Sequence, residues 1–363
     1  MTVVLLLAGA GLAADTKKPP LSAQQRKEML ELVTEFRKVR PEPKRRLDVI
    51  DRMEKIGPIG LNMLLDILQK EMGKQLSDYR NFFSQAAAAE GVKKLNEETL
   101  GEIAELRQKI LALSDDEELT KEKIVQIGDP GLARLKELVL FNREDVLEKN
   151  PALLKRRAPL EVLGKQWERC AMHLLAEQED ETPDEAKKEC ADEEEGEDEK
   201  ELAPPSFADY LVKEEEMATA LSMPMDAQTR TVLAGNEKLV GKLDPEESRC
   251  VLDLNLTRSL LGLRPLQIDV ALAKAARDHS SDMAEQKFFS HESPVSGKKT
   301  PWDRAKLAGT SSSAENIALG ALDGAAANQI WWHSPGHHKN MLGSHSRVGV
   351  GHHGKHWTEM FGQ

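Results

Sequence analysis

A strongly acidic segment near the middle of the chain most constrains what the sequence can fold into. From Glu177 to Glu201 the chain carries 15 Asp or Glu residues against three Lys, with few apolar side chains. Such a segment cannot bury enough apolar surface to offset the entropy lost on folding. We therefore interpret residues 177–205, which end at Pro204 and Pro205, as an acidic disordered linker with folded regions on either side.

The remaining composition is that of a globular protein. The formal net charge is −12, and the acidic segment accounts for all of it. The rest of the chain is balanced and offers no basic footprint for a nucleic acid, so we exclude that class of partner. A length of 363 residues with 40% hydrophobic residues suits about two domains. Three cysteines without a CxxC spacing argue against a disulfide scaffold and a thiolate zinc site.

Residues 1–14 form an apolar run that ends in small residues before Asp15. This pattern is typical of an export signal, although no basic residue precedes the apolar run. It predicts a secreted or extracytoplasmic protein; a disordered apolar tail is the alternative. The run is too short to cross a bilayer of about 30 Å, and no other apolar stretch is longer. We therefore expect no transmembrane segment.

Residues 22–175 predict an all-α helical region, because apolar residues recur there at helical spacing. Residues 56–65 and 127–135 resemble each other, and each places Gly and Pro between two apolar runs, as at the turn of a helix pair. This pattern resembles a degenerate HEAT-type repeat, and a plain helical bundle is the alternative. Residues 206–242 predict connecting helices. Asp244 followed by Pro245 then begins a new helix, so we place a domain boundary at residue 243.

Residues 279–363 hold nine of the ten histidines and four of the five tryptophans. Four short strings in the C-terminal part combine a histidine or a carboxylate with aromatic or glycine neighbours: residues 288–291, 314–318, 334–341 and 356–362. Such neighbours are typical of polar side chains that point into a walled cleft. We therefore expect any binding site or chemistry in this part of the chain.

The C-terminal third resembles the CAP family, which groups cysteine-rich secretory proteins, antigen 5 and pathogenesis-related proteins. The Ser-Pro-Gly-His string is the form found in the secreted bacterial branch of that family. The resemblance covers about residues 246–363 and implies an α+β fold with a three-layer α-β-α sandwich, here preceded by the helical region. It is carried, in this order, by Asn255, Arg258, Leu263, Pro265, Leu266, Ala275, His279, Met283, Ala284, Ser290, His291, Glu315, Asn316, Ile317, Ala318, Trp331, Ser334, Pro335, Gly336, His337, Asn340 and Met341.

The resemblance also implies a cleft with two histidines and two acidic residues, which holds a divalent metal in some members. His291 stands at the first histidine, Glu315 at the first acid and His356 at the second histidine. Ser334 stands where the second acid is expected, and His337 is the characteristic polar residue of the bacterial branch. We expect these five residues to line a cleft. Its predicted metal ligands are His291, His337 and His356, with zinc as the candidate ion.

Two further motifs occur in the chain, but we do not expect them to have their usual functions. Gly349, Gly351 and Gly354 fit a GxGxxG pattern, but only nine residues follow it. No helix can then hold a pyrophosphate, so we expect a strand and no nucleotide. His333 and His337 have HxxxH spacing, but Pro335 and Gly336 break the helix between them and no Glu follows His333. A metalloprotease of the HExxH type is excluded.

These observations favour a secreted binding or interaction module over an enzyme. Its ligand would be an unknown extracellular lipid, peptide or glycan, because the family resemblance does not select one. An extracellular hydrolase that uses the same cleft is the alternative, and a purely structural exported protein is a third reading. Catalytic residues stay unassigned, since the sequence has no GxSxG string and no cysteine near a cleft histidine.

Overall fold

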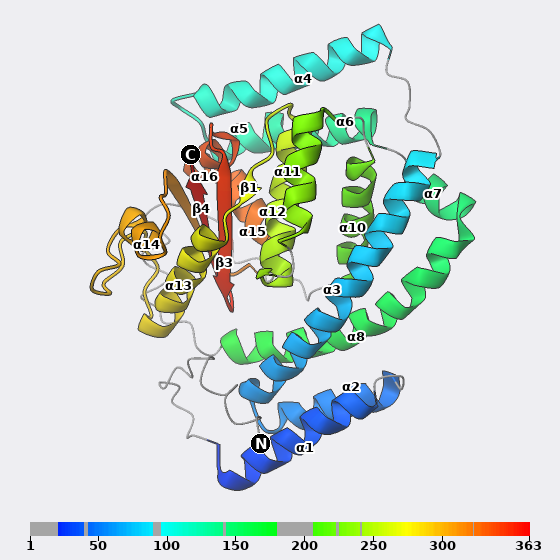
Figure 1. Ribbon diagram of the computed structural model, residues 1–363, viewed down its shortest axis with the longest axis vertical. Helices are drawn as coiled ribbons and strands as arrows, with labels where there is room; N and C mark the ends of the chain where they lie inside the picture. Colours follow the sequence, from blue (N-terminus) through cyan, green and yellow to red (C-terminus); the bar gives the residue numbers. More distant parts are fainter. Residues whose placement is uncertain are drawn as a thin grey trace.

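The computed structural model describes residues 21–39, 43–89, 96–140, 143–179, 206–222, 225–239, 242–321 and 323–363. The predicted export signal at residues 1–14 lies outside these ranges. So does the predicted acidic linker, except for residues 177–179, which end a long helix. Figure 1 shows a small sheet in the C-terminal part and helices through the rest of the chain.

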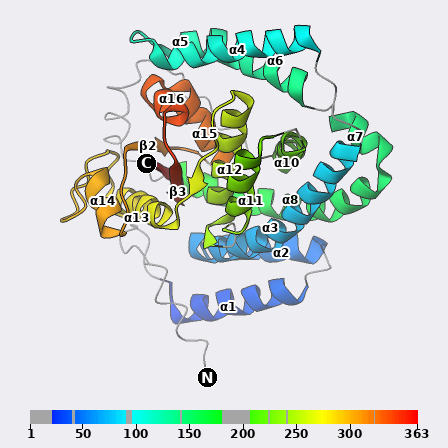
Figure 2. The same cartoon turned by 45° about the horizontal axis from the view of Figure 1, so that its top comes forward.

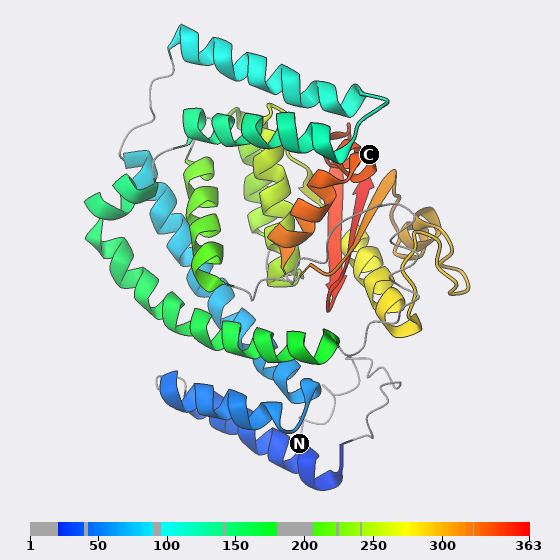
Figure 3. The same ribbon diagram turned by 180° about the vertical axis from the view of Figure 1, so that it is seen from behind.

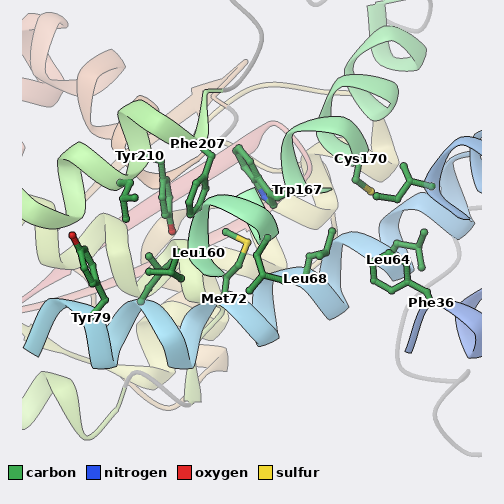
Figure 4. Packing of buried hydrophobic residues seen from close by; sticks show 14 of the residues in the cluster. Phe36, Leu64, Leu68, Met72, Tyr79, Leu160, Trp167, Cys170, Phe207 and Tyr210 are labelled. Carbon is green, nitrogen blue, oxygen red and sulfur yellow. The ribbon is translucent and has the colours of Figure 1, made fainter. Parts of the chain in front are cut away.

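The first group of helices builds a hydrophobic core of its own. It consists of α1 (Ala23–Lys38), α2 (Pro43–Glu54), α3 (Pro58–Ala89), α7 (Arg143–Lys149), α8 (Pro151–Glu179) and α10 (Phe207–Leu221). The long helices α3 and α8 contribute most of the buried side chains, and α10 packs against them. Figure 4 shows this first core from close by, with side chains that include Phe36, Leu64, Leu68, Met72, Tyr79, Leu160, Trp167, Cys170, Phe207 and Tyr210.

The two segments that resemble each other in sequence adopt different structures. Gly57 takes a φ of 132° directly before α3 begins at Pro58, so the first segment makes the expected turn. In the second segment, α5 (Lys121–Lys123), the π-helix η2 (Ile124–Gly128) and α6 (Asp129–Val139) follow without a break. The prediction of a turn at this second segment was wrong. A π-helical turn shifts the hydrogen-bond register, which accommodates a proline early in α6.

The C-terminal part contains one four-stranded sheet in the order β1-β3-β4-β2. Its strands are β1 (Gln267–Ile268), β2 (Ala314–Leu319), β3 (Arg347–His353) and β4 (His356–Gly362). β1 pairs with β3 in parallel, and β4 pairs antiparallel with both β3 and β2. Gly354, with a φ of 57°, lies in the two-residue turn between β3 and β4.

Helices cover both faces of this sheet, as Figures 1 and 3 show. α13 (Val270–Gln286) packs on one face, with α14 (Pro301–Leu307) beside it. α12 (Pro245–Leu260), α15 (Gly324–His333) and α16 (Pro335–Leu342) lie on the other side. The predicted α+β fold with a three-layer α-β-α sandwich is therefore confirmed.

The glycines of the GxG string bring the sheet close to α13. A Cβ atom on Gly349 would lie 2.1 Å from the backbone nitrogen of Ala273, and one on Gly351 would lie 2.0 Å from that of Arg277. No side chain fits at either position. The string is therefore a packing feature of β3, which is the strand that the sequence predicted here.

The core of the C-terminal part continues into helices from the first half of the chain. α4 (Glu97–Asp115), η2 and α6 contribute buried side chains to the same cluster as the sandwich, and α11 (Ala227–Glu237) lies beside β1. The boundary placed at residue 243 therefore falls within a shared second core. Its members include Ile110, Leu113, Ile124, Leu135, Val251, Leu254, Trp331, Trp332, Met341, Val348, Trp357 and Phe361.

Among the described ranges, no helix is both long and apolar enough to cross a bilayer.

Candidate functional site

Three separate elements bring the first predicted site residues together. His291 lies in the loop between α13 and α14, Glu315 is the second residue of β2, and His337 lies in the first turn of α16. A fourth residue, Arg304 of α14, completes the group. We call His291, Arg304, Glu315 and His337 the histidine cluster.

Glu315 is the centre of the histidine cluster. Its carboxylate accepts hydrogen bonds from Nη2 of Arg304 at 2.8 and 2.6 Å and lies 3.0 Å from Nδ1 of His291. The side chains of Arg304 and Glu315 are each 1% exposed, whereas that of His291 is 44% exposed. Because the carboxylate oxygen accepts, Nδ1 of His291 is the donor, and Nε2 is left for a group from outside.

His337 faces His291 across the cluster, with the two ring centroids 6.3 Å apart. Burial and the neighbouring His291 lower the pKa of His337 to about 4, so its imidazole is neutral at pH 7. Within the described part of the chain, its Nδ1 atom is buried without a hydrogen-bond partner. A neutral imidazole with a free nitrogen can donate or accept one hydrogen bond, depending on its tautomer.

A network of amides ties α16 to β2 beneath the cluster. Asn340 of α16 donates to Oδ1 of Asn316 at 2.8 Å, and Asn316 donates to Glu359 of β4 at 2.9 Å and to the carbonyl of His337 at 3.4 Å. Burial raises the pKa of Glu359 to about 8, despite the opposing effects of Asn316 and Arg258. Glu359 is therefore largely uncharged at pH 7, and it adds little charge beneath the histidines.

The other two predicted site residues are Ser334 and His356. Ser334 is the N-cap residue of α16, and its side chain makes no capping hydrogen bond. His356 begins β4 and pairs with Leu319, whereas Glu315 pairs with Met360. Four residues of strand correspond to about 13 Å, so His356 lies at the far end of the sheet from Glu315. There it pairs across the hairpin with His353.

The side chains of the histidine cluster do not fit a zinc site as they stand. The Glu315 carboxylate already accepts bonds from Arg304 and His291, so its oxygens are engaged. Across the described ranges, no three His, Cys, Asp or Glu side chains form a group that could hold a metal ion. The zinc prediction for His291, His337 and His356 stays a prediction.

Sequence reasoning did not identify Arg304 as part of the site. Its side chain makes the closest contact to Glu315 and also donates to the carbonyl of His291 at 3.1 Å. The chain offers only one local signal, because Thr300 and Asp303 form a capping box that starts α14 just before Arg304. That signal places a helix and not an ion pair.

Comparison with known proteins agrees with this architecture. Residues 253–358 match the family model described as CAP, the Cysteine-rich secretory protein family. The C-terminal third of the chain is therefore a CAP domain, as the sequence resemblance indicated. The residues before it are not covered by this match.

Two proteins of Bacillus subtilis are similar to about a third of the chain. YkwD, an uncharacterized protein, is 39% identical over 120 residues, which are 32% of this chain and 46% of YkwD. YlbC, an uncharacterized membrane protein, is 35% identical over 122 residues, which are 33% of this chain and 35% of YlbC. The match thus spans less than half the length of both curated relatives.

Solved structures with partial similarity include two bacterial proteins. An extracellular protein containing a SCP domain from Bacillus anthracis is 29% identical, with a TM-score of 0.32, covering 40% of this chain and 49% of that one. An outer surface protein from Borrelia burgdorferi is 18% identical, with a TM-score of 0.29, covering 33% of this chain and 92% of that one.

Proposed function

We propose that the protein is an exported binding module whose CAP domain recognises a polar ligand at the histidine cluster. The observation that carries this proposal is the pairing of a half-exposed imidazole with a buried ion pair. Arg304 and Glu315 hold Nδ1 of His291 in place, while the rest of the ring faces outward. A hydrogen-bonding group that is fixed in advance loses little entropy when a ligand binds. The apolar residues 1–14 support export.

The charges of the histidine cluster favour an uncharged polar ligand. Arg304 neutralises Glu315, and His337 carries no charge at pH 7 because its pKa is about 4. The neutral imidazole of His337 donates or accepts single hydrogen bonds, which suits hydroxyl and amide groups. A glycan or a peptide offers such groups, and both belong to the ligand classes expected from the sequence.

One observation favours a hydrolase as the second candidate. The Glu315–His291 pair resembles the arrangement in which a carboxylate orients a general base. A nucleophile is needed as well, yet no hydrogen bond joins a Ser, Thr or Cys side chain to either imidazole of the cluster among the described residues. Binding is therefore the function that the geometry supports better.

The test compares His291→Ala with His356→Ala in the full-length chain. His291 is half exposed, so its removal costs little stability, whereas Glu315→Gln would leave the charge of Arg304 buried without a partner, at a cost of about 3–5 kcal/mol. His356 is the matched control because it lies at the other end of the sheet. Soluble oligosaccharides and short peptides are titrated while the histidine side-chain NMR signals are recorded.

We expect a ligand that shifts the signals of His291 and His337 and that loses about tenfold in affinity in His291→Ala, the effect of one hydrogen bond. Its affinity should be unchanged in His356→Ala. Equal affinity for wild type and His291→Ala would remove the cluster as the binding site. Turnover of a probe would instead support the hydrolase. A zinc-dependent rise in melting temperature that disappears in His291→Ala would support the zinc prediction.

A further inference from the structure

Residues from the first half of the chain form hydrogen bonds to α15 and to α16, the helix that carries His337. Asp129, the first residue of α6, accepts a hydrogen bond from Nε1 of Trp332 at 2.8 Å and lies 2.9 Å from Nε2 of His333, both in α15. Lys339 of α16 donates to the carbonyl of Asp116 at 2.6 Å. Figures 1 and 2 both place α4 and α6 along the side of the sandwich where α15 and α16 lie.

The contact at Asp129 is close as well as polar. A Cβ atom on the neighbouring Gly128 would lie 3.3 Å from Cζ2 of Trp332 and 3.5 Å from Leu113. Gly128 ends the π-helix η2, and π-turns of this kind are frequent at functional sites. Trp332 is 4% exposed, so the indole is enclosed between η2, α4 and its own helix.

A short series of contacts connects Trp332 to the histidine cluster. The carbonyl of Trp332 lies 2.8 Å from Nδ1 of His338, and the two rings lie 4.3 Å apart. His338 is fully buried and is the neighbour of His337 in α16. Asn340, two residues further along, bonds to Asn316 beneath Glu315. The hydrogen bonds from Asp129 and Asp116 to α15 and α16 therefore also fix the end of α16 that faces His291.

We infer that residues 97–139 form a brace that sets the position of α16, and that Asp129 is a positioning residue for His337. The proposed binding function makes this position important for a ligand, but the inference itself concerns only the placement of His337. Asp129 does not touch the cluster, and it acts through Trp332, His333 and α16.

Simple packing is the competing explanation for these contacts. The brace contributes buried residues such as Ile110 and Leu135 to the second core, so its loss destabilises the protein whatever it does to His337. A stability measurement alone does not separate the two explanations. The NMR signals of the His337 ring do, because they depend on the distance and orientation of the neighbouring His291 ring and therefore on where α16 lies.

The experiment uses the full-length chain and three variants. Asp129→Ala removes both carboxylate oxygens, which contact Trp332 and His333. Asp129→Asn keeps an oxygen that accepts from Trp332. Arg134→Ala is the matched control, because Arg134 of α6 pairs with Glu102 of α4 at 2.7 Å within the brace and not with the sandwich. The ring signals of each histidine are measured by NMR at pH 7 in the absence of ligand, and circular dichroism monitors folding.

We expect the ring signals of His337 to shift in Asp129→Ala, because a looser α16 changes the position of this ring relative to that of His291. Asp129→Asn should restore most of the wild-type signals, and Arg134→Ala should leave them unchanged. Unchanged His337 ring signals in a folded Asp129→Ala protein would overturn the inference. Because no ligand is used, this outcome is independent of whether the proposed binding function holds.

A second variant keeps the test decisive if Asp129→Ala does not fold. Gly128→Ala adds one methyl group against Trp332, and the φ of −67° at this position suits alanine. It should displace α15 slightly and shift the ring signals of His337 as well. If Gly128→Ala folds and moves the signals of Trp332 without moving those of His337, the brace does not control the cluster.

Discussion

Two parts of the helical region have the same amphipathic pattern but belong to different cores. The first part consists of residues 23–89 and 151–174, which pack against each other and against α10, and its core lies apart from the sheet. Residues 97–139 are inserted between them in the chain, yet their buried side chains join the CAP domain. Figure 3 shows α4 and α6 beside the sandwich and α1 and α2 at the opposite end of the molecule. Neighbourhood in the chain thus does not decide which core a helix serves.

The two cores meet at a buried group of ion pairs. Arg249 of α12 donates to Glu214 of α10 and to Glu246, each at 2.5 Å, and Arg80 of α3 reaches Glu214 at 3.5 Å. Burial raises the pKa of Glu214 to about 7 and lowers that of Arg249 to about 9. Buried charges are tolerated only when each has a partner, so this junction demands a close fit of α3, α10 and α12.

The largest expected effect concerns the CAP domain without its brace. A fragment of residues 243–363 loses the contacts of Ile110, Leu113, Ile124 and Leu135. Burying such a side chain stabilises by about 1.5–3 kcal/mol, and four of them approach the whole stability of a typical domain, about 5–15 kcal/mol. We expect the fragment to unfold without a cooperative transition, as measured by thermal circular dichroism.

A peptide of residues 96–140 provides the control for this truncation. Added to the fragment, it should restore a cooperative transition, because it returns the missing side of the second core. A peptide with Leu135→Asp should fail to do so, since it would bury an unpaired charge. If residues 243–363 unfold cooperatively without any peptide, the CAP domain has a complete core of its own and the shared second core has little energetic weight.

The second prediction compares one truncation in each core. Leu68→Ala and Ile110→Ala each remove a fully buried aliphatic side chain, and each should destabilise by about 2–5 kcal/mol. Their local effects should differ. Hydrogen exchange should accelerate in α3 and α8 for Leu68→Ala, and in α15, α16 and the sheet for Ile110→Ala. Equal acceleration throughout the molecule for both variants would show a single cooperative unit instead of two cores.

The sequence predicted parts of the CAP third well where a motif coincides with one element. The string around Glu315 became β2, and Asp244 with Pro245 began α12 as expected. Contacts between distant elements were beyond its reach. Apolar spacing shows that α4 has a buried face, but it does not say which partner covers that face. The position of His356 depends on the register of β2 with β4, which no local motif specifies.

Arg304 illustrates the same limit within the candidate site. An arginine in a short helix is ordinary by composition, and nothing near it in the chain marks a pairing with Glu315 eleven residues later. Only the packing of α14 beside β2 turns it into a fully buried partner of the carboxylate. That pairing also changes the chemistry, because it engages oxygens that a metal ion would need.

The smallest expected effect concerns acid and distinguishes the two cores by a titrating group. His279 of α13 is fully buried against the sheet side of the CAP domain, its Nε2 lies 3.1 Å from the carbonyl of Ser290, and its ring lies beside that of Phe288. Burial lowers its pKa to about 4. Glu315 opposes this shift, while Arg304 and His291 add to it.

The sign of the acid effect follows from where protons bind. Below pH 6.5 the unfolded chain protonates His279 while the folded protein does not, so stability is fully present above pH 6.5 and is lost as the pH falls towards 4. A shift of this size corresponds to about 3 kcal/mol at most. Urea unfolding of wild type and His279→Asn at pH 7 and pH 4.5 measures it. The loss of stability on acidification should be smaller in the variant, and the protection factors of the sheet amides against hydrogen exchange should fall less in the variant than in wild type. An equal loss in both proteins would place the acid sensitivity outside α13 and remove this distinction between the cores.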